Sequence, residues 1–130
     1  MNQIVEEIKK TGTFYVATDD NGIPHVRPFS SITEFEGTPY LCTNNTKKVF
    51  AQILKKSDVE ISGMEKDGTW IRVTGQLVSD NRSDAQAAML ADPTGPSNLY
   101  HLGDGLFEVF RLENAVCTKY SFTSDPVIIK

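Results

Sequence analysis

The sequence lacks long hydrophobic runs, a surplus of basic residues and a glycine-rich phosphate-binding motif. No stretch approaches the roughly eighteen successive apolar residues that a membrane span needs, and with Glu6 and Glu7 near its beginning we expect no secretory signal. The 13 basic residues are dispersed and outnumbered by 17 acidic ones, so the net charge is -4. Such a chain has no overall field that would attract nucleic acid. We therefore expect a soluble, cytoplasmic protein with no nucleic-acid or membrane partner, in which any anion site is local.

Cysteine is scarce as well. The two cysteines, Cys42 and Cys117, have no spacing typical of a metal site and lie in apolar, strand-like contexts. A disulfide would need an oxidising compartment, which nothing else in the sequence suggests. We expect two buried free thiols and no metal site.

The 130 residues suffice for one domain with a substantial core, and we expect residues 1–130 to form it. The first part predicts a short amphipathic helix, because Ile4, Val5 and Ile8 form one apolar stripe before Gly12. Residues 13–18 predict a strand, and the Asn-Gly pair at 21–22 predicts a hairpin turn. A second strand over 25–35, a turn at 36–37 and a third strand over 40–43 would complete an antiparallel meander.

Further along, the apolar period becomes helical over residues 47–56. Strands are expected over 59–64 and 70–79, joined by a hairpin turn at 67–68. A third helix is expected over 83–90, ending before Pro93, and a loop follows over 92–97. Two last strands, 106–112 and 116–122, are expected around a turn at 113–114, and the tail after residue 124 is expected to be peripheral.

Six or seven strands mostly linked by hairpins, with three helices, predict a mainly β fold: an antiparallel barrel whose ends are plugged by helices. Strands and helices do not alternate as in parallel nucleotide-binding sheets, and the sequence contains neither G-x-G-x-x-G nor a P-loop. A doubly wound nucleotide-binding fold is therefore not expected.

The most informative segment runs from Thr43 to Lys48, where a strand is expected to pass into a helix. Asn45 or Thr46 is a suitable N-cap, which places Lys47 and Lys48 in the first helical turn. The helix dipole is positive there, so each exposed cation costs about 0.3 to 1 kcal/mol. A bound phosphate would offset that cost, because backbone N–H, hydroxyl and ammonium groups converge on it. Two solvated lysines are the alternative interpretation.

Two more positions are candidates for ligand binding. Arg27 lies within a predicted strand beside Pro28, and a proline there indicates an edge or a bulge where a ligand can approach the backbone. A salt bridge at the barrel rim is the alternative role for Arg27. Trp70 begins a long strand and shares its more polar face with Arg72, and the alternative for the tryptophan is to cap the core.

In their order and spacing, these segments resemble the pyridoxamine 5'-phosphate oxidase-like flavin-binding split barrels. The resemblance covers about residues 12–78. It depends on Val26-Arg27-Pro28, on Thr43-Asn44 before Thr46-Lys47-Lys48 and a Gln-Ile helix, and on Trp70-x-Arg72-Val73-x-Gly75. It implies a split β-barrel of Greek-key type, flavin mononucleotide (FMN) as cofactor, and a homodimer with cofactor sites at the interface.

The resemblance also assigns residues to that cofactor. Arg27, Thr46, Lys47 and Lys48 would bind the phosphate and the ribityl chain. Trp70 and Arg72 would reach the cofactor of the partner subunit. The complete implied set is Arg27, Pro28, Phe29, Ser30, Thr43, Asn44, Thr46, Lys47, Lys48, Trp70 and Arg72.

The function implied is an FMN-dependent oxidoreductase that acts on a small molecule, with substrate choice in the loop over residues 92–104. Family members that oxidise pyridoxamine phosphate are longer and end with an arginine- and histidine-bearing segment that residues 126–130 do not match, so that activity is not expected. No catalytic residue is assigned, although His25 and His101 are candidate proton donors and Tyr100 is a candidate to line the flavin face. The alternatives are a non-catalytic protein that stores or senses flavin, a barrel that binds haem or deazaflavin, and a cofactor-free interaction module.

Overall fold

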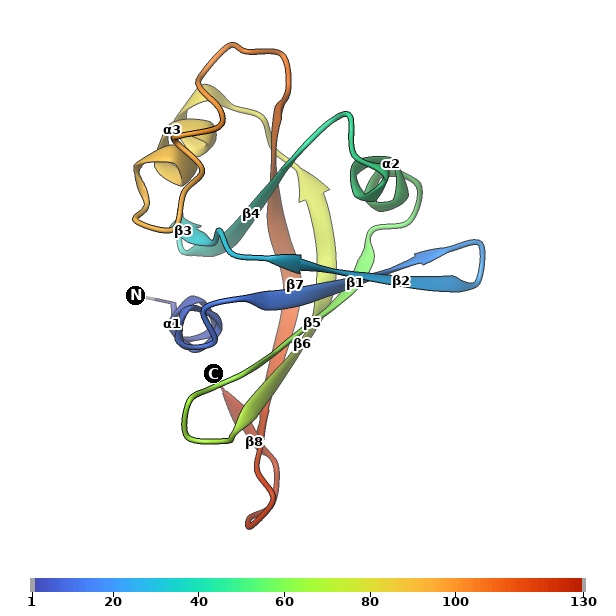
Figure 1. Cartoon of the computed structure of the whole chain (residues 1–130), viewed down its shortest axis with the longest axis vertical. Coiled ribbons are helices and arrows are strands. Elements are labelled where there is room, and N and C mark those ends of the chain that lie inside the picture. The colour runs from blue at the N-terminus through green and yellow to red at the C-terminus, as the bar shows by residue number, and fades with distance from the viewer. Residues whose placement is uncertain (1, 130) are drawn as a thin grey trace.

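A computed structural model describes residues 2–129 (Figure 1). Its elements, in chain order, are α1 (Gln3–Lys10), β1 (Phe14–Asp20), β2 (Ile23–Phe29), β3 (Thr33–Phe35), β4 (Thr38–Asn44), α2 (Lys48–Lys55), β5 (Asp58–Met64), β6 (Trp70–Ser79), α3 (Ser83–Ala91), β7 (Phe107–Tyr120) and β8 (Val127–Ile129). Within the described residues, no helix is long and apolar enough to cross a membrane.

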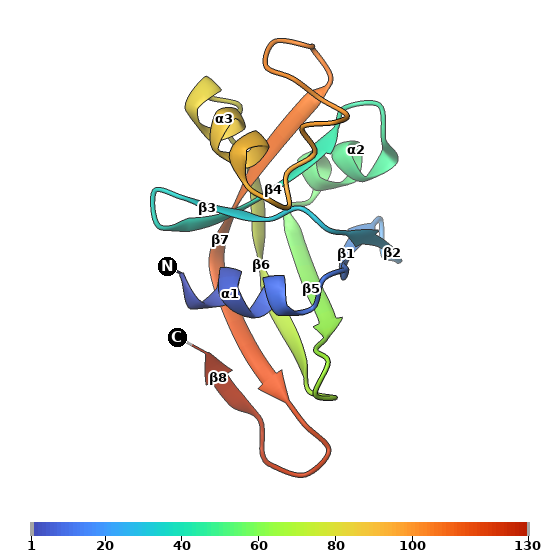
Figure 2. The same ribbon diagram turned by 60° about the vertical axis from the view of Figure 1, so that its left-hand side comes forward.

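The described strands form one antiparallel sheet in the order β2-β1-β5-β6-β7-β4-β3, and β8 pairs with β7. Figures 1 and 2 show the three helices placed around this curved sheet, with α2 and α3 towards one end. The mainly β split-barrel fold predicted from the sequence is confirmed.

The core has two parts. The larger part fills the inside of the sheet, and α1 and α2 close it by burying Val5, Ile8, Val49 and Ile53. The smaller part lies between α3 and the strands β4 and β7, and it consists of Tyr40, Cys42, Ala85, Met89, Phe107 and Val109. Both cysteines are buried free thiols, as predicted.

The predicted meander of the first three strands is wrong. Only residues 23–29 of the expected second strand pair with β1, and residues 33–35 pair with β4 at the opposite end of the sheet. Between the two edges, Ile32 is buried and its backbone N–H and C=O both bond to Thr94 Oγ1, at 3.0 and 2.9 Å. Where the chain crosses from one edge to the other, the side chain of Thr94 thus provides the backbone hydrogen bonds that a neighbouring strand provides elsewhere.

The predicted turn at residues 113–114 is also wrong, because β7 is one strand over 14 residues. Both of its halves pair with β6, and the register shifts between Thr74 and Gln76. Asn114 has a φ of 54°, so the turn-forming residue marks a β-bulge within the strand. The tail after residue 124 is not wholly peripheral, since β8 pairs with β7.

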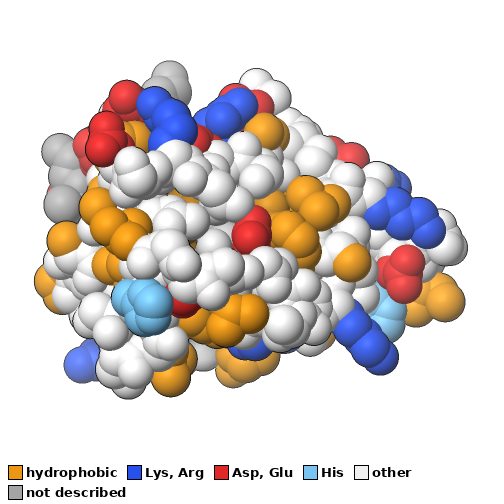
Figure 3. Space-filling model, turned by 90° about the horizontal axis from the view of Figure 1, so that it is seen from above, with side chains coloured by type: hydrophobic (Ala, Val, Ile, Leu, Met, Phe, Trp, Pro, Cys, Tyr) orange, Lys and Arg blue, Asp and Glu red, His pale blue; other side chains and the backbone are white. Residues whose placement is uncertain are grey.

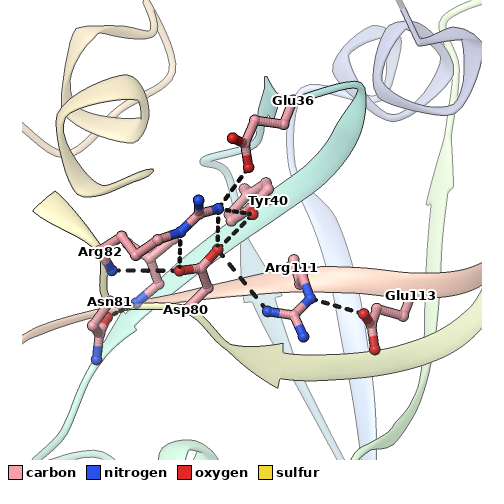
Figure 4. Close-up of polar contacts among 8 residues, drawn as sticks. Glu36, Tyr40, Asp80, Asn81, Arg82, Arg111 and Glu113 are labelled. Carbon is pink, nitrogen blue, oxygen red and sulfur yellow. Dashed lines mark hydrogen bonds and ion pairs between the residues drawn. The ribbon is translucent and has the colours of Figure 1, made fainter. Parts of the chain in front are cut away.

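A polar cluster connects α3 to the β3–β4 hairpin (Figure 4). Asp80 accepts hydrogen bonds from Tyr40 Oη at 2.6 Å and from Arg82 Nε and Nη2 at 2.9 Å each. The Arg82 side chain bonds on to Glu36 at 2.6 Å. These bonds, above all those from Arg82, hold the pKa of the Asp80 carboxyl well below its usual range. The cluster satisfies a buried carboxylate and fixes the start of α3.

Candidate functional site

A pocket of about 340 Å³ opens at the end of the molecule that carries α2 and the loop after α3. Four segments meet there: the end of β2 with the residues that follow it, the end of β4, the start of α2 and the loop over residues 96–100. The lining residues are Thr13, Arg27, Pro28, Phe29, Ser30, Ser31, Cys42, Thr43, Lys47, Val49, Pro96, Leu99 and Tyr100. Figure 3 views this end of the molecule, where basic and acidic side chains are interspersed with hydrophobic and uncharged atoms.

Arg27 is held in the pocket wall by uncharged groups. Its Nη1 donates to Thr18 Oγ1 at 2.8 Å and to Val16 O at 3.2 Å, and its Nη2 donates to Gln52 Oε1 at 2.7 Å. Partial burial lowers the pKa of the guanidinium, and no carboxylate of the described residues lies within ion-pair distance. The side chain is thus a positioned cation without a counter-ion, rather than the rim salt bridge that the sequence left open.

The start of α2 lies beside Arg27 but differs from the prediction. Lys47 is the N-cap, and no side chain caps the helix, so the predicted cap at Asn45 or Thr46 is wrong. Thr46 does not cap the helix because its N–H and its hydroxyl both donate to the preceding Asn44 Oδ1, at 3.0 and 2.5 Å. Lys47 lines the pocket, whereas Lys48 begins the helix outside the lining. Neither lysine forms an ion pair within residues 2–129.

Tyr100 forms another part of the pocket wall. Its hydroxyl oxygen accepts a hydrogen bond of 2.6 Å from Asn44 Nδ2. Its ring stacks on Phe107 with the ring centroids 5.4 Å apart. The loop after α3 is therefore anchored to the end of β4 at the pocket.

The structure brings only part of the predicted set together. Six predicted residues line the pocket: Arg27, Pro28, Phe29, Ser30, Thr43 and Lys47. Asn44 touches the pocket through Tyr100, and Thr46 bonds to Asn44, while Lys48 lies outside the lining.

Trp70 and Arg72 do not line this pocket. Trp70 lines a second, largely apolar pocket together with Tyr15, Met64 and Phe122. Arg72 Nε donates to Glu60 Oε2 at 2.7 Å on the outer face of the sheet. Their predicted contact with a partner's cofactor stays a prediction.

Sequence reasoning missed the lining residues Thr13, Ser31, Cys42, Val49, Pro96 and Leu99. One of them carried a signal, because the Asn-Gly hairpin pairs Phe14 with Phe29 and so places Thr13 next to Ser30. Pro96 and Leu99 reach the pocket through the path of a long loop, which has no local sequence code.

The titratable groups around the pocket restrict its chemistry. Burial raises the pKa of the Cys42 thiol to about 12, which keeps it protonated at neutral pH. His25 and His101 are exposed and do not line the pocket. The pocket therefore offers cations and hydroxyl groups to a ligand rather than a reactive thiolate or an imidazole.

No protein-family model matches the sequence, and no curated protein matches it. Among solved structures, the chain is 38% identical to a NimC/NimA family protein from Clostridium acetobutylicum, with a TM-score of 0.94 over 99% of this chain and 90% of that one. A general stress protein 26-related protein of the pyridoxinephosphate oxidase family, from the same organism, is 15% identical, with a TM-score of 0.70 over 98% and 92% of the two chains. A heme binding protein from Mycobacterium smegmatis is 16% identical with a TM-score of 0.75, and the match covers 98% of this chain but 57% of that protein.

Proposed function

The chain belongs to the same family as the NimC/NimA protein, within the pyridoxamine 5'-phosphate oxidase-like split barrels, and from this premise we propose that it binds FMN in the pocket beside Arg27 and Lys47. The observation that carries the proposal is that these two cations line one pocket while no carboxylate of the described residues pairs with either. Cations held in this way attract an anionic ligand, and a phosphate satisfies both charge and hydrogen bonding.

The surrounding groups support a phosphate at this position. The first two backbone N–H groups of α2, those of Lys48 and Val49, have no acceptor within the helix, whereas that of Phe50 donates to Lys47 O at 3.2 Å. The helix dipole is positive at that end. Arg27 keeps its Nε and part of its Nη2 available, because Val16, Thr18 and Gln52 occupy the remaining donors. Phe29, Ser30 and Thr43 then lie along the wall for the rest of the cofactor.

Haem is the second candidate ligand, because a heme binding protein shares the fold. Haem iron needs an axial ligand such as a histidine or a cysteine thiolate. Neither histidine lines the pocket, and the thiol of Cys42 is protonated because burial raises its pKa to about 12. Flavin is therefore favoured over haem, and deazaflavin would have to use the same groups.

We further propose that the protein is an oxidoreductase acting on a small molecule. A bound flavin supplies the hydride or electron chemistry itself. The residues of this chain then need only hold its phosphate, through Arg27 and Lys47, and shape the space beside its ring. The alternative is storage or sensing of flavin without turnover. The cytoplasm, where free thiols such as Cys42 and Cys117 persist, is the proposed location.

We also propose a homodimer in which the second pocket is part of the interface. Phe122 is 84% exposed and Met64 is 56% exposed, and both lie against Tyr15 and Trp70. The Trp70 ring lies 4.8 Å from the ring of Phe122, centroid to centroid. Exposed apolar clusters of this kind mark protein–protein contacts. In such a dimer Trp70 and the nearby Arg72 would reach the cofactor of the partner subunit.

The experiment that tests the proposal begins with the absorption spectrum of the purified protein, with and without added FMN. A yellow preparation that releases FMN on heating is expected. Anaerobic addition of a nicotinamide donor then separates the two functional classes, because an enzyme's flavin bleaches and is reoxidised by a substrate. A colourless protein that does not bind added FMN would refute the flavin assignment, and a haem-type spectrum would favour the second candidate.

A further inference from the structure

The hydroxyl group of Tyr100 is the last member of a chain of hydrogen bonds in which the donor and the acceptor of each bond can be assigned. The chain starts at the backbone N–H of Thr46, which lies 3.0 Å from Asn44 Oδ1. A backbone N–H can only donate, so the amide atom that faces it must be the oxygen. The hydroxyl of Thr46 donates to the same oxygen at 2.5 Å. The orientation of the Asn44 amide is thereby determined.

It follows that the NH2 group of Asn44 faces Tyr100, where it lies 2.6 Å from the phenolic oxygen. An amide NH2 group only donates, so Tyr100 Oη must be the acceptor and its own proton must point elsewhere. Within residues 2–129 no acceptor receives that proton. Stacking on Phe107 holds the ring in place, and Tyr100 lines the pocket. The side chain of a pocket-lining residue thus carries an O–H donor without an acceptor among the described residues.

We propose that Tyr100 is a hydrogen-bond donor that recognises an acceptor atom of the bound flavin, with Asn44 as the positioning residue that turns the phenolic proton towards the ligand. This inference rests on the proposed FMN site and adds to it a residue in the loop after α3. Flavin offers suitable acceptors at its ring carbonyls and ring nitrogens and at its phosphate. The competing view is that Tyr100 only packs against the ligand through its ring.

Tyr100→Phe removes the donor and keeps the ring. The dissociation constant for FMN, measured by quenching of flavin fluorescence, is expected to rise about fivefold, which corresponds to the loss of one hydrogen bond between neutral groups. Riboflavin, measured in parallel, narrows the position of the acceptor: a similar loss for both ligands places it on the ring or the ribityl chain, and a loss for FMN alone places it on the phosphate. No loss with either ligand would overturn the proposal.

Asn44→Asp reverses the chain without removing the phenol. One carboxylate oxygen still accepts from Thr46, while the other accepts the proton of Tyr100 and turns it away from the pocket. In the Asn44→Asp background, Tyr100→Phe should therefore have little further effect on FMN affinity, in contrast to its effect in the wild type. Asn98→Asp, on the exposed part of the same loop and outside the lining, is the matched control for the added negative charge.

Measuring Tyr100→Phe in both backgrounds distinguishes failure of this inference from failure of the proposed FMN site. An equal loss from Tyr100→Phe in the wild-type and Asn44→Asp backgrounds would show that only ring packing matters, and it would refute the directed donor while leaving the FMN site intact. A wild-type protein that binds no FMN would refute the proposed function and this inference together. Circular dichroism of each variant, compared with the wild type, confirms that the comparison is made between folded proteins.

Discussion

Replacing Lys47 with alanine should weaken FMN binding much more than the same replacement of its neighbour Lys48. The two variants remove the same charge from adjacent residues, and both side chains are exposed. Lys47 lines the pocket at the N-cap of α2, whereas Lys48 lies outside the lining. A hydrogen bond to a charged group contributes about 1.5 to 3 kcal/mol, and exposure of Lys47 places it near the lower limit.

A loss of about 1.4 kcal/mol corresponds to a tenfold rise in the dissociation constant for Lys47→Ala. Lys48→Ala removes an exposed charge outside the pocket lining, and salt at about 0.15 M weakens the effect of such a charge, so a change below about twofold is expected. Titration of apoprotein with FMN at low and physiological salt measures both constants. Equal losses for the two variants would mean that only the general field of the helix start matters. No loss for Lys47→Ala would refute the phosphate site at this position.

Two further predictions concern stability and assembly. Asp80→Asn should lower the free energy of unfolding by about 2 kcal/mol at neutral pH, because the side chain is only 5% exposed and accepts from Tyr40 and Arg82. Its lowered pKa means that this stabilisation is fully present above the ordinary carboxyl pKa and is lost as the pH falls from there through the lowered value. The urea unfolding curves of wild type and variant should therefore begin to converge only below about pH 4 and should meet at the acid limit. A gap that persists in acid would contradict the assignment. Phe122→Asp should convert the proposed dimer to a folded monomer, measured by light scattering, since it places a charge in the exposed apolar cluster; a dimer that persists would place the interface elsewhere.

Local sequence patterns predicted the elements whose pairing is local. The strand over residues 70–79 has the predicted bounds because its alternation continues along its whole length, and the Asn-Gly turn closes the β1–β2 hairpin as predicted. The predictions were wrong where residues far apart in the sequence determine how a segment pairs. The crossing at Ile32 depends on Thr94, which lies 62 residues away, and turn-forming residues at 113–114 fit a bulge because β6 supports both halves of β7.

In the candidate site, too, the residues with an unusual local context were predicted, and those placed by long-range contacts were not. Arg27 and Lys47 were identified because each is unusual in its own local context, a cation in a proline-containing edge strand and a cation at a helix start. In the wall formed by the loop after α3, the sequence indicated Tyr100 but not Pro96 or Leu99, since their positions depend on how a long loop folds back over the end of β4. Thr46 and Lys48 carry the same residue types as the pocket residues, and only the backbone path around the N-cap separates them from it.

The crossing between β2 and β3 also has a consequence for the order of folding. Residues adjacent in the chain occur on opposite edges of the sheet, and the pocket residues Pro28 to Ser31 lie at the start of that crossing. Their position is fixed only when both edges and the loop that carries Thr94 have formed, and contacts between such distant segments form slowly. A nascent chain in which these contacts have not yet formed therefore lacks the complete pocket, and a ligand of this pocket stabilises the finished molecule by mass action.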